Sequence, residues 1–198
     1  TVKALNECLP TENRPIHLHE PCFAGKEWEY TKQCLDEGMV SSVGSQVDHF
    51  EHLLEEYTGA SHAVAVVNGT AALHVALQLI KVEQDEEILL PSMTFVATAN
   101  AIAYCNATPH FIDCESGTLG VDANKLRAYL KSISDLRSDA CYNKKTGRRI
   151  RGLIAVHTFG HPVDLDTLIG VCDQYHIELI EDAAESLGSF YKDRHTGT

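Results

Sequence analysis

The chain has 198 residues, and its 44% hydrophobic and 22% charged residues are the composition of a globular protein with one well-filled core. Its formal net charge is -12. Nucleic acids and anionic membranes are bound through clustered lysines and arginines, so this charge argues against either as a partner.

The seven cysteines are widely spaced, odd in number and without a C-x-x-C pair, which is typical of reduced thiols. No apolar run reaches the roughly 20 residues of a membrane span, and no signal peptide is recognised. We therefore expect a cytoplasmic protein. The chain begins at Thr1 and stops in polar sequence at Thr198, so we expect both ends to be trimmed.

Residues 1–60 are expected to form an N-terminal segment with two helices. Prolines interrupt any periodic pattern in residues 1–24, which are predicted to be irregular. Amphipathic helices are predicted over 26–36 and 47–57, and each is followed by a glycine suited to end it.

From residue 61 to 198, short apolar runs alternate with helical patterns. Strands are predicted at 63–67, 88–90, 110–112, 152–156 and 177–180, and helices at 73–80, 96–104, 122–130 and 165–172. This alternation predicts an α/β fold with a mostly parallel sheet flanked by helices. Ligands should then gather at the carboxyl ends of the strands.

Residues 131–150 break this alternation with a polar stretch that ends in basic residues. We interpret it as a surface hairpin or loop insertion. The alternative is that Arg148, Arg149 or Arg151 holds an anionic ligand.

Asn68, Gly69, Thr70 and Ala71 follow a predicted strand and open a predicted helix. Free backbone N–H groups and the positive end of the helix dipole would favour a phosphate there. A plain turn with a helix cap is the alternative interpretation.

Two further residues follow predicted strands. Phe95 lies just beyond the strand at 88–90, where its ring could stack on a planar cofactor or simply fill the core. Asp182 follows the strand at 177–180, where a partly buried carboxylate needs a cationic or donor partner unless it caps the next turn. A protonated pyridine nitrogen would be such a partner.

Four segments together closely resemble the DegT/DnrJ-type nucleotide-sugar aminotransferases, which bind pyridoxal phosphate (PLP) on fold type I. They are residues 68–73 (Asn-Gly-Thr-Ala-Ala-Leu), 91–95 (Pro-Ser-Met-Thr-Phe), 159–162 (Phe-Gly-His-Pro) and 181–188 (Glu-Asp-Ala-Ala-Glu-Ser-Leu-Gly). The resemblance runs from about residue 25 to the end of the chain. It is greatest for the subgroup tied to legionaminic acid and related bacterial surface sugars.

The resemblance implies roles for individual residues. Gly69, Thr70 and Ala71 match the family's phosphate-binding turn, and Phe95 matches the aromatic that stacks on the pyridine ring. Asp182 matches the acid paired with the ring nitrogen and is the catalytic residue that we assign.

Glu185 falls where the family often has glutamine or histidine near the 3'-oxygen of the cofactor, and we assign it to cofactor binding. His157 is either a pocket residue or a structural histidine. We expect no metal site, because Gly160 and Pro162 prevent His157 and His161 from sharing one helix.

The family's Schiff-base lysine would lie beyond Thr198, since Lys192 comes too early and lacks the right context. Residues 61–198 would thus be part of a PLP-binding large domain whose C-terminal part and small domain are absent, and they would be inactive alone. The family builds each active site from two subunits, so a homodimer is expected.

The resemblance implies a transaminase that passes an amino group, with glutamate as the expected donor, to a nucleotide-linked keto sugar in bacterial surface-polysaccharide biosynthesis. A second hypothesis is a PLP-dependent nucleotide-sugar dehydratase, in which histidine replaces the lysine. A third is a regulatory or binding protein that keeps the PLP fold without catalysis.

Overall fold

The computed structural model describes residues 2–9 and 21–198. It divides into two compact units, with the boundary between Asp48 and His49. Among the described helices, none is long and apolar enough to cross a membrane.

The N-terminal unit is helical. It contains α1 (Val2–Cys8), α2 (Glu27–Asp36) and the start of α3 (Ser45–Thr58), which continues into the second unit. The two predicted helices are confirmed as α2 and α3. The irregular conformation predicted for residues 1–24 is wrong at 2–8, where no proline interrupts the helix; residues 10–20 lie outside the described part of the chain.

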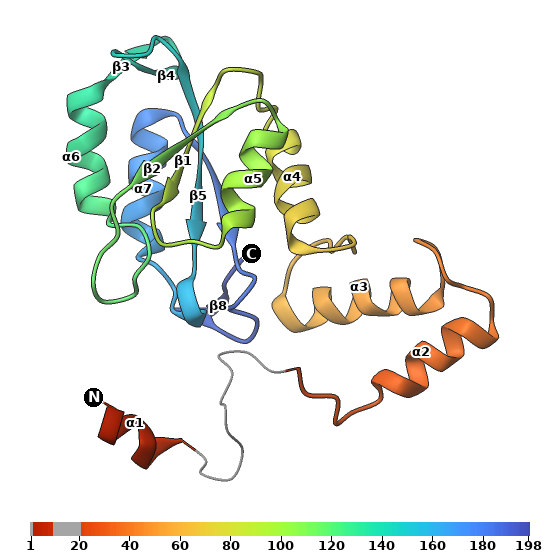
Figure 1. Cartoon of the computed structure of the whole chain (residues 1–198). Coiled ribbons are helices and arrows are strands. Elements are labelled where there is room, and N and C mark those ends of the chain that lie inside the picture. Colours follow the sequence, from red (N-terminus) through yellow and green to blue (C-terminus); the bar gives the residue numbers. More distant parts are fainter. Residues whose placement is uncertain (1, 10–20) are drawn as a thin grey trace. The chain divides into compact units, whose positions relative to one another are not determined.

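The second unit is built on a six-stranded sheet (Figure 1). Its parallel strands lie in the order β2, β1, β5 and β6, which span Thr108–Ile112, Glu87–Pro91, Arg149–Val156 and Glu178–Asp182. The antiparallel strands β4 (Ala140–Asn143) and β3 (Ser134–Arg137) extend the sheet beyond the first residues of β5. A separate two-stranded hairpin joins β7 (Phe190–Tyr191) to β8 (Arg194–His195).

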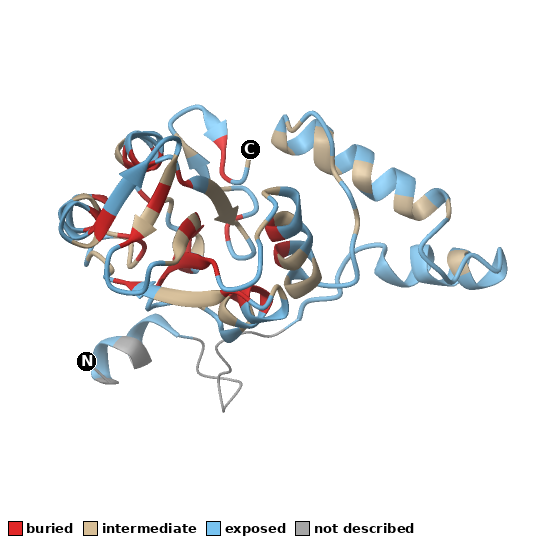
Figure 2. Cartoon of the chain, turned by 90° about the horizontal axis from the view of Figure 1, so that it is seen from above, coloured by how far each residue is buried: buried red, intermediate tan, exposed pale blue. Residues whose placement is uncertain are grey.

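Helices cover both faces of the sheet, which gives three layers (Figure 1). One face packs against α4 (Gly69–Leu79) and α5 (Val96–Tyr104), and the other against α6 (Ala123–Ile133) and α7 (Leu165–Tyr175). The buried residues gather between these layers (Figure 2). Alternate residues of each strand enter opposite cores, as in β5, where Leu153 faces α6 and α7 while Ile154 faces α4 and α5. The predicted α/β class is therefore confirmed.

The strand predicted at 63–67 is wrong. These residues form no strand, and Val64 and Val67 are 78% and 88% exposed. A strand needs a neighbour for its backbone, and no described strand pairs with this segment. Instead, the side chains of Glu55 and Glu51 accept the N–H groups of Ala63 and Ala65.

The polar stretch at 131–150 forms the predicted hairpin, β3 and β4. Arg148, Arg149 and Arg151 lie at the amino end of β5, away from the edge where ligands were expected. Arg148 donates to Thr108 Oγ1 at 2.8 Å, Arg149 forms an ion pair with Glu86, and Arg151 Nε donates to a backbone carbonyl. These contacts favour the interpretation of the stretch as structural rather than as a grip on an anion.

Candidate functional site

The carboxyl ends of β1, β2, β5 and β6 meet at one edge of the sheet, because these four strands are parallel. Asp182 is the last residue of β6. Its Oδ2 accepts a hydrogen bond from Thr98 Oγ1 at 3.1 Å, and its Oδ1 accepts one from the N–H of Ala184 at 3.3 Å. Both donors are neutral, so the carboxylate is oriented without being neutralised.

Thr98 connects Asp182 to the segment that contains Phe95. Thr98 lies in the first turn of α5 and is fully buried, and Thr94 Oγ1 donates to its hydroxyl at 2.8 Å. Phe95 is the residue before α5 and is 77% exposed. Phe95 therefore stands at the same edge as Asp182, with its ring open to a ligand rather than in the core.

Helix α4 begins at this edge as well (Figure 1). It packs on α5 and contacts β6, and its first residue is Gly69. Asn68 caps it by accepting the N–H of Ala71 at 2.9 Å. The N–H groups of Gly69 and Thr70 lie in the first turn, where a helix offers no acceptor, so they are available to an anion. The sequence suggested either a helix cap or an anion site at this turn. The two use different N–H groups, so the turn can serve as both.

The turn after β5 borders the same edge. Phe159 has a left-handed backbone with φ of 53°, which is unusual for a residue with a side chain, and Gly160 follows with φ of 82°. Glu185 Oε2 accepts the Phe159 N–H at 2.9 Å, and Ser189 Oγ donates to the Gly160 carbonyl. Strained turns of this kind cost about 1–3 kcal/mol and cluster at functional sites.

His157 is buried and pairs with Glu181. Its Nε2 lies 2.8 Å from Glu181 Oε2, while its Nδ1 accepts the N–H of Val163 at 3.3 Å. Nδ1 therefore carries no proton, and Nε2 donates to the carboxylate. Of the two interpretations of His157, the geometry favours a histidine that structures the edge over one that lines a pocket.

Glu181 is held as an anion. Burial alone would raise its pKa, but the hydrogen bonds from His157 and from the N–H of Gly197 outweigh burial and hold the pKa below its usual value. Glu181 and Asp182 lie on opposite faces of β6, because neighbouring strand residues alternate.

Sequence reasoning missed Thr98, Thr94 and the Glu181 pairing. A threonine in the first turn of a helix after a strand is a weak signal, because it is equally suited to simple packing. The hydrogen bond from Thr98 to Asp182 spans 84 residues of sequence and needs the folded sheet to form.

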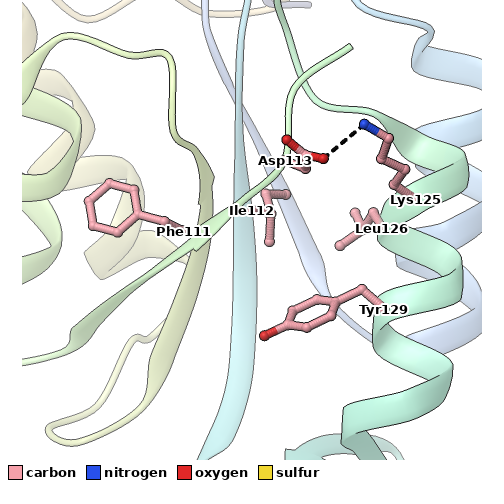
Figure 3. Close-up of a pocket in the computed structure, with 6 residues that line it drawn as sticks. All are labelled: Phe111, Ile112, Asp113, Lys125, Leu126 and Tyr129. Atoms are coloured by element: carbon pink, nitrogen blue, oxygen red, sulfur yellow. Dashed lines mark hydrogen bonds and ion pairs between the residues drawn. The ribbon is translucent and has the colours of Figure 1, made fainter.

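A cavity of about 400 Å³ lies elsewhere, between β2 and α6 (Figure 3). Figure 3 shows the residues that line it: Phe111, Ile112, Asp113, Lys125, Leu126 and Tyr129. Its polar groups have partners within the protein, since Lys125 Nζ binds Asp113 Oδ2 at 2.8 Å and the Tyr129 hydroxyl contacts His110 Nε2 at 3.0 Å. None of the residues assigned to the candidate site lines this cavity.

The mostly parallel sheet with helices on both faces is the fold of the large domain of fold type I PLP-dependent proteins, which are its structural neighbours. The sequence profile of the DegT/DnrJ/EryC1/StrS aminotransferase family matches residues 21–198. The chain belongs to this family, whose cofactor is PLP.

Similar proteins agree with this assignment. GDP-perosamine synthase of Escherichia coli O157:H7 is 33% identical over 183 residues, or 92% of this chain and 46% of that protein. GDP-perosamine synthase of Vibrio cholerae is 34% identical over the same shares. The X-ray structure of the aminotransferase from Psychrobacter cryohalolentis has a TM-score of 0.75 and 28% identity, covering 89% of this chain and 41% of that one. The chain spans a little under half the length of these relatives.

The described residues suit PLP. A phosphate would meet the free N–H groups at the start of α4, and the exposed ring of Phe95 would meet the pyridine ring. The carboxylate of Asp182 accepts only from neutral donors, so a protonated ring nitrogen would give it a charged partner.

Proposed function

We propose that the protein is a PLP-dependent aminotransferase that converts a nucleotide-linked keto sugar to an amino sugar, with glutamate as amino donor, in bacterial surface-polysaccharide biosynthesis. The observation that carries this proposal is Asp182, a carboxylate at the end of β6 that is oriented by Thr98 and has no cationic partner among the described ion pairs. The relatives named GDP-perosamine synthase support a nucleotide-linked sugar as substrate.

The residues of the chain would each do one task. Asp182 holds a proton at the ring nitrogen, because an anion beside that nitrogen favours its charged form. Bound PLP supplies an electron sink for the substrate carbon once its ring nitrogen is protonated. Phe95 fixes the plane of the ring, and the N–H groups of Gly69 and Thr70 bind the phosphate with Ala71 in the same turn.

Glu185 is proposed to lie near the 3'-oxygen of the cofactor. Its backbone stands three residues after Asp182, on the segment that leaves the same edge. Its side chain also holds the strained Phe159 turn, so the two parts of the edge are tied together.

The test uses the full-length protein with PLP, glutamate and nucleotide-linked 4-keto sugars, with the product analysed by mass spectrometry. An amino sugar that takes its nitrogen from labelled glutamate is the expected product. A sugar that loses a hydroxyl group and gains no nitrogen would indicate the dehydratase. A protein that binds PLP but changes no sugar, and that yields no lysine adduct after borohydride treatment, would indicate the non-catalytic alternative.

We further propose a homodimer. Helix α2 has no buried residue, and Trp28 on it is 74% exposed, as expected of a helix that packs on a neighbour. Sedimentation of the active full-length protein at micromolar concentration should give twice the monomer mass. A monomer in the active sample would contradict this proposal.

A further inference from the structure

The end of β6 carries two adjacent carboxylates, Glu181 and Asp182. Asp182 is directed toward α5, where Thr98 binds it, and Glu181 is directed to the opposite face, where His157 binds it. Within residues 2–9 and 21–198, no lysine or arginine forms a salt bridge with either carboxylate. The end of this strand is therefore a concentrated site of negative charge.

Burying an anion without a cationic partner is costly, so the arrangement requires an explanation. The side chain of Glu181 is only 16% exposed. Its hydrogen-bond donors are the imidazole of His157, whose other nitrogen accepts the Val163 N–H, and the backbone N–H of Gly197. Arg194 on β8 acts on Glu181 only through its charge, at longer range.

The hydrogen bonds also fix where this charge sits. His157 binds Glu181 through its ring and, through its own backbone N–H, donates to the carbonyl oxygen of Asp182 at 3.1 Å. The residue that follows β5 thus holds both acidic residues at the end of β6. A buried charge in a fixed position beside Asp182 acts on the same ligand as Asp182 does.

We propose that Glu181 is a positioning residue. Its negative charge adds to that of Asp182 and favours a protonated ring nitrogen on the ligand, although Glu181 does not touch the ligand. The proposal rests on the proposed function, because it takes PLP as the ligand at Asp182. Asp182 supplies the direct contact, Glu181 supplies the surrounding negative field, and His157 holds Glu181 in place.

The size of the effect follows from the charges. At an effective dielectric constant of about 20, a unit charge about 10 Å away shifts a pKa by roughly one unit. Removing the charge of Glu181 should therefore lower the apparent pKa of a bound ring nitrogen by about one unit. A purely structural role would leave that pKa unchanged once the protein had folded.

The test is a pH titration of full-length protein loaded with ¹⁵N-labelled PLP, in which the ¹⁵N chemical shift reports protonation of the ring nitrogen. Glu181→Gln keeps the shape of the side chain and leaves an oxygen to accept both hydrogen bonds. We expect its ring nitrogen to lose its proton about one pH unit lower than in the wild type. An unchanged titration would overturn the proposal.

Three further variants sharpen the test. Glu87→Gln removes the same charge from a buried Glu–His pair at the other end of the sheet and should leave the ring nitrogen unaffected. Arg194→Gln, on an exposed residue, should raise the apparent pKa, because it removes a positive charge near Glu181. His157→Gln retains that negative charge and should shift the titration less than Glu181→Gln; a larger shift would show that geometry rather than charge is responsible.

The titration distinguishes failure of the role of Glu181 from failure of the proposed function. A wild-type protein that binds no PLP, or whose bound PLP lies away from Asp182, would contradict the proposed function itself. A wild-type protein with PLP at Asp182 and a Glu181→Gln variant with the same titration would contradict only the role of Glu181.

Discussion

Two buried Glu–His pairs lie on the same face of the sheet, one at each end. Glu87, at the amino end of β1, pairs with His110 of β2 at 2.7 Å, and Glu181 and His157 pair at 2.8 Å at the carboxyl edge. Glu87 also accepts hydrogen bonds from Asn143 Nδ2 and Thr146 Oγ1. It therefore fastens the β3–β4 hairpin to the sheet.

The surroundings of the two pairs differ. At the amino end, His110 also contacts the Tyr129 hydroxyl, and the nearby arginines pair with acidic residues or with backbone. At the carboxyl edge, negative charge accumulates beside a strained turn and an exposed aromatic ring. The same pair of residue types thus stabilises the fold in one place and, we infer, tunes a ligand site in the other.

The largest expected effect comes from Asp182→Ala in the full-length protein. It removes the direct partner of the ring nitrogen, so turnover should fall about 10²-fold to 10³-fold, as for loss of one well-placed electrostatic group. Steady-state kinetics and circular dichroism would measure this. The Asp182→Ala protein should stay folded, and wild-type turnover in that variant would remove the basis for calling this edge catalytic.

Glu87→Ala should instead reduce stability. It removes the acceptor of three hydrogen bonds and leaves the buried amide of Asn143 unsatisfied, so the free energy of unfolding should fall by roughly 3 kcal/mol. Urea denaturation measures this, and Glu87→Gln is the milder control. If Glu87→Ala lowered turnover at full ligand saturation without lowering stability, Glu87 would not be a purely structural residue. The contrast between a structural pair at the amino end and a ligand-site pair at the carboxyl edge would then be wrong.

The pH dependence of stability follows from the pKa of Glu87. Burial would raise this pKa, but the hydrogen bonds from Thr146, Asn143 and His110 outweigh burial and hold it below the ordinary value of 4.5. The unfolded chain then binds more protons between the two values, so the stabilisation is complete above about pH 4.5 and is lost as the pH falls through the folded pKa.

Denaturation midpoints of wild type and Glu87→Gln between pH 3 and 7 would check this. We expect the Glu87→Gln protein to lose less stability than the wild type below about pH 4.5. Equal slopes in the two proteins would rule out Glu87 as a source of the acid dependence.

The smallest predicted effects compare two helix caps. Asn68 caps α4 at the candidate site, and Asp122 caps α6 away from it by accepting the Lys125 N–H. Replacing either residue with alanine should cost about 1 kcal/mol of stability. Only Asn68→Ala should also weaken PLP binding, because it disturbs the turn that presents Gly69 and Thr70. Equal PLP affinity in both variants would argue against a phosphate at α4.

Strong local patterns made most of the fold predictable. Helix α5 was predicted at 96–104 and is found there, and the strand predicted at 177–180 ends at Asp182 as β6. The segment at 63–67 was predicted wrongly, since a short apolar run indicates a strand but cannot supply the neighbouring strand that it needs.

The residues of the site were predictable only in part. Phe95 and Asp182 were predicted just after strands, and the ends of parallel strands meet at one edge of the sheet. Their roles with PLP remain proposals. The hydrogen bond between His157 and Glu181 was not predictable, because these residues are 24 positions apart and meet only when β5 and β6 pair.

The most direct test of the contrast between the two ends is a crystal structure of the full-length protein with PLP. We predict the ring nitrogen about 2.7–2.9 Å from a carboxylate oxygen of Asp182, the phosphate at the N–H groups of Gly69 and Thr70, and Glu87 still bound to the hairpin. PLP bound at the amino end of the sheet, or with its ring nitrogen turned away from Asp182, would contradict this prediction.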